Sequence, residues 1–112
     1  MTILGNDIKQ KKCKPCEGGV KPLTPDEYGA FLRQELSGWR DKDEKMIEKE
    51  YAFKDFAEAL AFINRIGKIA EEEGHHPDIY LHNWNKVKIT LSTHAIGGLS
   101  ENDFILASKI DA

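Results

Sequence analysis

The feature that most constrains the fold is a helical repeat of apolar residues in the middle of the chain, at 54–73. Apolar side chains recur there at steps of three and four residues, at Phe56, Ala59, Leu60, Ile63, Ile66 and Ala70. This spacing places them on one face of an α-helix. Phe62 and Ile69 widen the stripe, so we expect a heavily covered helix. Gly67 predicts a close contact with a neighbour, and Gly74 predicts the helix end.

Strand patterns flank this helix on both sides. Residues 39–53 predict two short strands around a charged turn at 41–44, with an inner face of Ile47, Tyr51 and Phe53 that Lys49 interrupts. Residues 78–84 and 85–93 predict a second pair. In the last strand Val87, Ile89 and Leu91 alternate with Lys86, Lys88, Thr90 and Ser92. Such alternation is typical of a strand with one buried face.

Capping signals mark two further helices. Thr24 is a good N-cap, with Pro25 at the first helical position and Glu27 three residues on. Ser100 and Asp103 repeat the capping-box spacing near the chain end. The element order is therefore α-β-β-α-β-β-α. It predicts a two-layer α+β domain, in which helices cover one face of a four-stranded antiparallel sheet.

Residues 1–22 form a separate arm rich in lysine, glycine and proline, and residues 23–112 form the single domain. Cys13 and Cys16 make a CxxC in this arm. A tetrahedral zinc site needs about four ligands, and no second CxxC is present. A redox CxxC is expected between a strand and a helix. We therefore expect reduced, unligated thiols, with a disulfide or a metal site completed by another chain as the alternatives.

Charge and hydropathy exclude several classes of function. The net charge of −3 gives no support for nucleic-acid binding. No apolar run approaches the roughly 20 residues that a membrane helix needs. The first residues lack the apolar stretch of a secretory signal. We expect an intracellular, cytoplasmic protein without a membrane partner.

Residues 71–94 contain every histidine of the chain: His75, His76, His82 and His94. Imidazole titrates near neutral pH, so this cluster indicates proton transfer or metal binding. Neighbouring side chains of an extended segment point apart, which makes joint metal ligation by the histidine pair awkward. The alternative is a solvated histidine pair and a surface His94, and we expect His82 to face outward.

Several motifs together resemble the pterin-4a-carbinolamine dehydratases. They are His75-His76-Pro77, Asn85-Lys86-Val87, Thr90-Leu91-Ser92-Thr93-His94, Gly97-Gly98-Leu99-Ser100 and Asp103-Phe104. The resemblance covers residues 23–112. The arm resembles an extension on some microbial members. Two departures are Gly74, acidic in some members, and Ile96, cysteine in some.

The resemblance implies a hydro-lyase that dehydrates 4a-hydroxytetrahydropterin to the quinonoid dihydropterin. This reaction belongs to tetrahydrobiopterin recycling, with an aromatic amino-acid hydroxylase as pathway partner, and needs neither metal nor cofactor. The resemblance also implies a homodimer or homotetramer. The alternative is a non-catalytic dimerisation or regulatory partner built on the same fold.

The family's active-site histidines match His75, His76 and His94, and its acidic partner matches Glu71. We expect His75 and His94 to transfer protons, His76 to position the pterin and Glu71 to orient an imidazole. Further substrate contacts are expected from Pro77, Ser92, Thr93 and Trp84. The segment before Asn85 is about one residue longer than in animal-type members, so Tyr80 competes with Trp84 for the aromatic wall.

Overall fold

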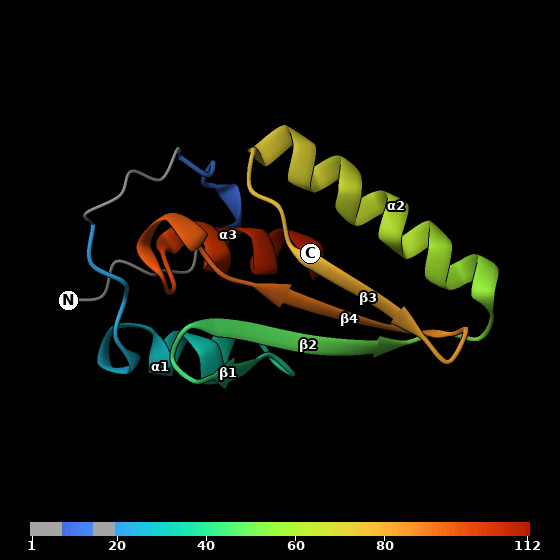
Figure 1. Cartoon of the computed structure of the whole chain (residues 1–112), viewed down its shortest axis with the longest axis horizontal. Coiled ribbons are helices and arrows are strands. Elements are labelled where there is room, and N and C mark those ends of the chain that lie inside the picture. The colour runs from blue at the N-terminus through green and yellow to red at the C-terminus, as the bar shows by residue number, and fades with distance from the viewer. Residues whose placement is uncertain (1–7, 15–19) are drawn as a thin grey trace.

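A computed structural model describes residues 8–14 and 20–112. Its four-stranded antiparallel sheet has the order β1-β2-β4-β3. The strands are β1 (Arg40–Lys42), β2 (Met46–Ala52), β3 (Asp78–His82) and β4 (Lys86–Leu91). The helices are α1 (Pro25–Glu35), α2 (Phe56–Glu73) and α3 (Glu101–Ile110), with short 3₁₀ turns η1 (Ile8–Gln10) and η2 (His94–Ile96). Figure 1 shows this arrangement, and the predicted α+β order is confirmed.

The helices and the sheet share one apolar core. Val87, Ile89 and Leu91 of β4 are each 0% exposed, whereas the residues between them are only partly covered. Because successive strand residues point to opposite faces, β4 turns its apolar side to the helices and its lysines away from them. The expected inner and outer faces of this strand are confirmed.

Both expected capping boxes form. In the first, the Thr24 backbone N–H donates to Glu27 Oε1 at 2.9 Å, with Pro25 at the start of α1. In the second, the Ser100 backbone N–H donates to Asp103 Oδ2 at 2.9 Å. These contacts satisfy N–H groups that the first helical turn leaves without partners.

Lys49 has a physical reason to lie on the inner face of β2. Its ammonium donates to the Ser37 carbonyl and to Asp111 Oδ2, each at 3.0 Å. Asp111 also accepts from Tyr51 and from the indole of Trp39. The lysine therefore ends in a polar cluster at the margin of the core.

Two expectations for α2 are wrong. Of its residues only Ala59, Ile66 and Ala70 are buried, while Phe56 is 48% and Leu60 39% exposed. A Cβ added to Gly67 would meet nothing within 4 Å. The apolar stripe is wider than the surface that one sheet covers, so its outer part faces away from the domain. Gly74 does end the helix, in a left-handed conformation.

The turns of both hairpins differ from expectation in length. Each contains two consecutive residues with positive φ, Asp43 and Glu44 in the first and Asn83 and Trp84 in the second. The strand pairings leave three residues in each loop, 43–45 in the first hairpin and 83–85 in the second. The first turn is consequently shorter than the predicted 41–44 segment. Trp84 lies at the tip of the second hairpin and is 60% exposed.

The described part of the arm lies against the domain. Ile8 is 3% and Cys13 8% exposed, and both belong to the apolar core. Cys16 lies outside the described residues. Within residues 8–14 and 20–112, no helix combines the length and apolar character needed to cross a membrane.

Candidate active site

A pocket of about 250 Å³ lies at the end of the two central strands. Its lining consists of Lys45, Met46, Ser92, Thr93, His94, Gly97 and Gly98. Met46 begins β2, and Ser92 and Thr93 follow β4. The pairing of Ile47 with Leu91 sets these two strand ends side by side. The pocket therefore depends on the register between β2 and β4.

A short loop fixes His94 at this pocket. Thr93 and Gly98 pair as an isolated antiparallel bridge, and their backbone groups hydrogen-bond at 2.8 and 3.4 Å. Gly97 ends the η2 turn with φ +67°. His94 is exposed, and its ring has no hydrogen-bond partner among the residues that the structure describes. An accessible imidazole without an internal partner is available to a bound molecule.

His75 belongs to a buried hydrogen-bond network that ends at the pocket wall. Its Nε2 lies 2.6 Å from Asp103 Oδ1, and its side chain is 12% exposed. Asp103 is 0% exposed, and its Oδ2 accepts from the Thr93 hydroxyl at 2.8 Å. Thr93 lines the pocket beside His94. One carboxylate therefore connects His75 to the pocket lining.

The network has a defined hydrogen-bond direction when Asp103 is ionised. A carboxylate only accepts, so Nε2 of His75 and the Thr93 hydroxyl both donate to it. The Ser100 hydroxyl, 2.8 Å from Thr93 Oγ1, then donates to Thr93. Nδ1 is left as the nitrogen of neutral His75 that is able to accept a proton.

His76 lies in a different environment. Its Nε2 is 2.5 Å from Glu71 Oε2, and the two side chains are 61% and 77% exposed. The expected contact between Glu71 and an imidazole is therefore present. Neither His75 nor His76 is among the residues that line the pocket. The structure thus gathers Ser92, Thr93 and His94 at one cavity, joins His75 to it indirectly and leaves the His76–Glu71 pair on the surface.

Two other predicted contact residues also lie outside the lining. Pro77 follows the histidine pair and is partly buried. Trp84 lies at the opposite end of β4 from Ser92, about 20 Å away along a six-residue strand. One chain alone therefore does not bring Trp84 to this pocket.

His82 lies on the sheet face away from the helices. Its Nε2 pairs with Glu50, and its ring stacks on Tyr80 with centroids 4.8 Å apart. The contact with Glu50 joins β3 to β2 across the outer side of β4. His82 is thus an outward strand residue, as expected.

Sequence reasoning missed Asp103 as a site residue, along with Lys45 and Met46. The sequence marks Asp103 as a helix-capping acid and as part of a family motif, but gives no sign that its second oxygen holds His75. In residues 8–14 and 20–112, no group of three His, Cys, Asp or Glu side chains has metal-holding geometry.

Comparisons with known proteins agree on one family. The family model described as pterin 4 alpha carbinolamine dehydratase matches residues 21–112. A protein of Alkaliphilus metalliredigens, provisionally named pterin-4-alpha-carbinolamine dehydratase, is 49% identical over 95% of each chain. The mitochondrial pterin-4-alpha-carbinolamine dehydratase 2 of Arabidopsis thaliana is 44% identical over 94% of this chain and 58% of its own length.

Solved structures agree in fold. A transcriptional coactivator/pterin dehydratase from Brucella melitensis superposes with a TM-score of 0.74 and 35% identity, over 81% of this chain and 96% of that one. A pterin dehydratase-like protein described as a RuBisCO assembly factor of the alpha-carboxysome gives a TM-score of 0.57 and 30% identity, over 66% and 86% of the two chains. The chain therefore belongs to the pterin 4 alpha carbinolamine dehydratase family, and its relatives identify it as a hydro-lyase.

Proposed function

We propose that the chain dehydrates 4a-hydroxytetrahydropterin to the quinonoid dihydropterin by histidine general acid–base catalysis, as a step of tetrahydrobiopterin recycling in the cytoplasm. The observation that carries the proposal is the pocket at the end of β4. It presents the ring of His94, which has no partner among the described residues, beside Thr93, which a buried carboxylate connects to His75.

The reaction needs two proton transfers. The bond between C4a and the hydroxyl oxygen breaks, the N5 proton is removed, and the N5 electron pair forms the new C4a–N5 double bond. An imidazolium that protonates the leaving oxygen releases it as water, and a neutral imidazole takes the N5 proton. Each positioned group of this kind contributes about 10²–10⁴-fold to the rate. The summed reaction consumes no external acid or base.

We assign the two transfers to His94 and His75, in an order left open. His94 meets the pterin directly in the pocket. The Asp103 carboxylate holds His75 in the tautomer that leaves Nδ1 free, which is the role of the acid that orients a catalytic histidine. Ser92 and Thr93 offer polar contacts to the ring edge. His76, held by Glu71, and Pro77 lie outside the pocket lining, so they contact the pterin only where it extends beyond this pocket.

Stopped-flow absorbance tests the activity of the unmodified chain. We expect the 4a-hydroxytetrahydropterin signal to decay at least about 10²-fold faster in the presence of catalytic amounts of protein than in buffer. Serum albumin at the same concentration controls for non-specific buffering. Decay that matches the albumin control would contradict the dehydratase assignment.

We also propose that two or more copies associate in solution. β3 is an edge strand with unpaired backbone groups on one side, and Ile79 and Tyr80 on it are 37% and 58% exposed. Such an edge pairs readily with another strand. The exposed Phe56 and Leu60 of α2 supply a second apolar surface. Light scattering at micromolar concentration should give a dimer or tetramer mass, and the 12.7 kDa mass of one chain would contradict this.

A non-catalytic regulatory role is the second candidate. It is favoured by two similar structures, one described as a transcriptional coactivator/pterin dehydratase and the other as a RuBisCO assembly factor. A histidine network of this kind is unnecessary for a pure scaffold. Absence of dehydration by the unmodified chain, together with retained self-association, would favour the regulatory role.

A further inference from the structure

The arm segment, Ile8–Lys14, bridges the end of α2 and the start of α3. The Cys13 backbone N–H donates to Glu73 Oε1 at 2.9 Å, which ties the arm to the last residue of α2. Lys14 and Asn102 exchange two hydrogen bonds, from the Lys14 N–H to Asn102 Oδ1 at 3.0 Å and from Asn102 Nδ2 to the Lys14 carbonyl at 2.6 Å. In Figure 1 the blue arm segment runs beside α3 on the side where α2 ends.

Both attachment points adjoin the pair that forms the buried network. Glu73 lies two residues before His75, and Asn102 directly precedes Asp103. The Glu73 side chain is 9% exposed and Asn102 is 7% exposed. His75 and Asp103 come from elements that the arm holds together, because one follows α2 and the other lies in the first turn of α3.

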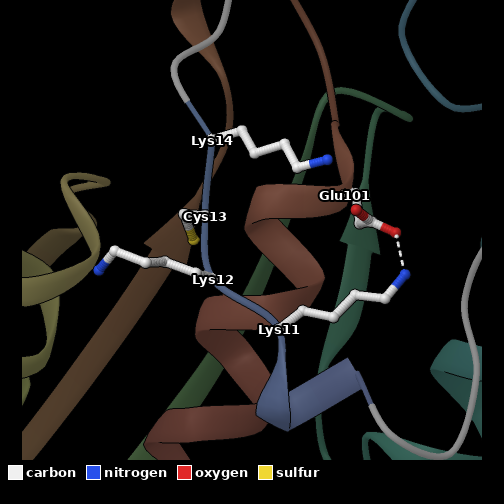
Figure 2. A pocket seen from close by; sticks show the side chains of 5 residues that line it. All are labelled: Lys11, Lys12, Cys13, Lys14 and Glu101. Atoms are coloured by element: carbon white, nitrogen blue, oxygen red, sulfur yellow. Dashed lines mark hydrogen bonds and ion pairs between the residues drawn. The ribbon is translucent and has the colours of Figure 1, made fainter.

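The arm segment turns the Cys13 side chain toward the domain. The Cys13 sulfur lies 3.6 Å from the Asn102 carbonyl of α3. Figure 2 shows Lys11 and Lys14 extending on the side of Glu101, and Lys12 extending to the opposite side. Lys11 pairs with Glu101 at 3.0 Å, and Lys12 donates to the Glu72 carbonyl at 2.7 Å. These side chains line a second pocket of about 400 Å³, whose lining contains no histidine. The arm is thus attached by its backbone, by Cys13 and by the side chains of Lys11 and Lys12.

We infer that the arm segment is a positioning element for the His75–Asp103 pair, and that Asn102 is the positioning residue through which it acts. The Asn102–Lys14 exchange fixes the first turn of α3, and the Cys13–Glu73 contact fixes the end of α2. Together they set the separation of His75 and Asp103. The catalytic part of this inference rests on the proposed function, whereas its structural part does not.

The charge of Glu73 supports the attachment. Burial acts to raise the pKa of Glu73, but the Cys13 N–H and the Lys109 ammonium, with Lys12 nearby, outweigh it and leave the pKa below its ordinary value. A carboxylate with a lowered folded-state pKa stabilises the fold above its unfolded-state pKa, and this contribution is lost as the pH falls through the folded-state pKa. The arm is therefore held by an ionised Glu73 at neutral pH.

Cys13 provides a reporter of arm attachment that is independent of catalysis. Burial, with the neighbouring Glu73 carboxylate, raises the pKa of the Cys13 thiol to about 12. The thiolate is the reactive form, so the attached arm protects Cys13 from thiol reagents. In a Cys16→Ser background, Asn102→Ala should speed the reaction of Cys13 with a disulfide reagent about 10-fold or more, because it removes two partly buried hydrogen bonds.

Lys11→Ala in the same background is the matched control. It removes only the partly exposed ion pair with Glu101, so the labelling rate should change less than about 2-fold. Circular dichroism and a cooperative thermal transition establish that each variant is folded. An unchanged labelling rate in folded Asn102→Ala would overturn the inference at its first step.

The ring resonances of His75 test the second step. We expect the ¹⁵N shift of His75 Nε2 in Asn102→Ala to move toward its position in Asp103→Asn, while Lys11→Ala leaves it in place.

We also expect kcat of Asn102→Ala to fall about 3- to 10-fold with KM changed less than 2-fold, because small misplacement of a catalytic group acts on the chemical step. Faster labelling with an unmoved His75 resonance would overturn the inference and make the arm a cover only. A shifted resonance in a chain without any dehydration would sustain the positioning and contradict the proposed function instead.

Discussion

Replacing His94 with alanine is expected to lower kcat/KM for carbinolamine dehydration by about 10²–10⁴-fold, the range that a positioned general acid or base contributes. His94 is the only one of the predicted catalytic histidines in the pocket lining, and its ring has no partner among the described residues whose loss would disturb the fold. Stability should therefore change by less than about 0.5 kcal/mol, as for surface substitutions. Stopped-flow absorbance gives the rate, and urea unfolding gives the stability.

His82→Ala is the matched control for the His94 variant. His82 is a histidine of the same hairpin region, but its ring pairs with Glu50 on the outer sheet face. Its replacement should leave kcat/KM within about 2-fold of the unmodified chain, since it contacts no residue of the pocket lining. Equal losses in the two variants, or no loss in His94→Ala, would contradict the assignment of the pocket.

Replacing Asp103 with alanine is expected to destabilise the domain by about 3–5 kcal/mol, because each buried donor left without an acceptor costs about 1–3 kcal/mol. Asp103 is 0% exposed and accepts from His75, from the Thr93 hydroxyl and from the Ser100 backbone N–H. The variant leaves these donors without a partner, and it also removes the capping box of α3. Urea unfolding measures the loss, which is large beside a total stability of about 5–15 kcal/mol.

Two substitutions, at residue 101 and at residue 103, distinguish an effect on stability from an effect on catalysis. Glu101→Gln removes only the contact with Lys11 and should change stability by less than about 1 kcal/mol. Asp103→Asn keeps the side-chain size but introduces a donor, so it should fold while kcat falls about 10²-fold or more through the wrong His75 tautomer. Full activity in a folded Asp103→Asn would contradict the orienting role.

The element order and the core of the sheet were predictable from the sequence, because they follow from local patterns. The alternation at Val87, Ile89 and Leu91 identified the buried face of β4, and the two capping boxes located the starts of α1 and α3. These signals depend on neighbours within a few residues. They can therefore be recognised in the sequence without knowledge of the rest of the fold.

The features that the sequence did not reveal depend on contacts between distant segments. Asp103 reads locally as a helix cap, and only the fold brings His75, 28 residues away, to its other oxygen. Lys49 interrupts an apolar face because Asp111, at the far end of the chain, accepts its ammonium. The width of the α2 stripe predicts burial, but the sequence does not say how much surface the sheet can cover.

The residues of the candidate site were largely predictable from the sequence, but their arrangement in space was not. The resemblance in the motifs around the histidines identified Ser92, Thr93 and His94, which line one pocket. The adjacent His75 and His76 differ more than their sequence positions suggest, since one contacts buried Asp103 and the other contacts exposed Glu71. Opposite orientations of neighbouring side chains in extended backbone account for this divergence.

A crystal structure with a bound dihydropterin tests the central claim most directly. We expect the bicyclic ring in the pocket between Met46, Ser92 and His94, with a His94 ring nitrogen within hydrogen-bond distance of N5 or of the C4a substituent. His75 should keep its contact with Asp103. A pterin bound elsewhere, such as against Trp84 at the far end of β4, with His94 facing only solvent, would contradict the account.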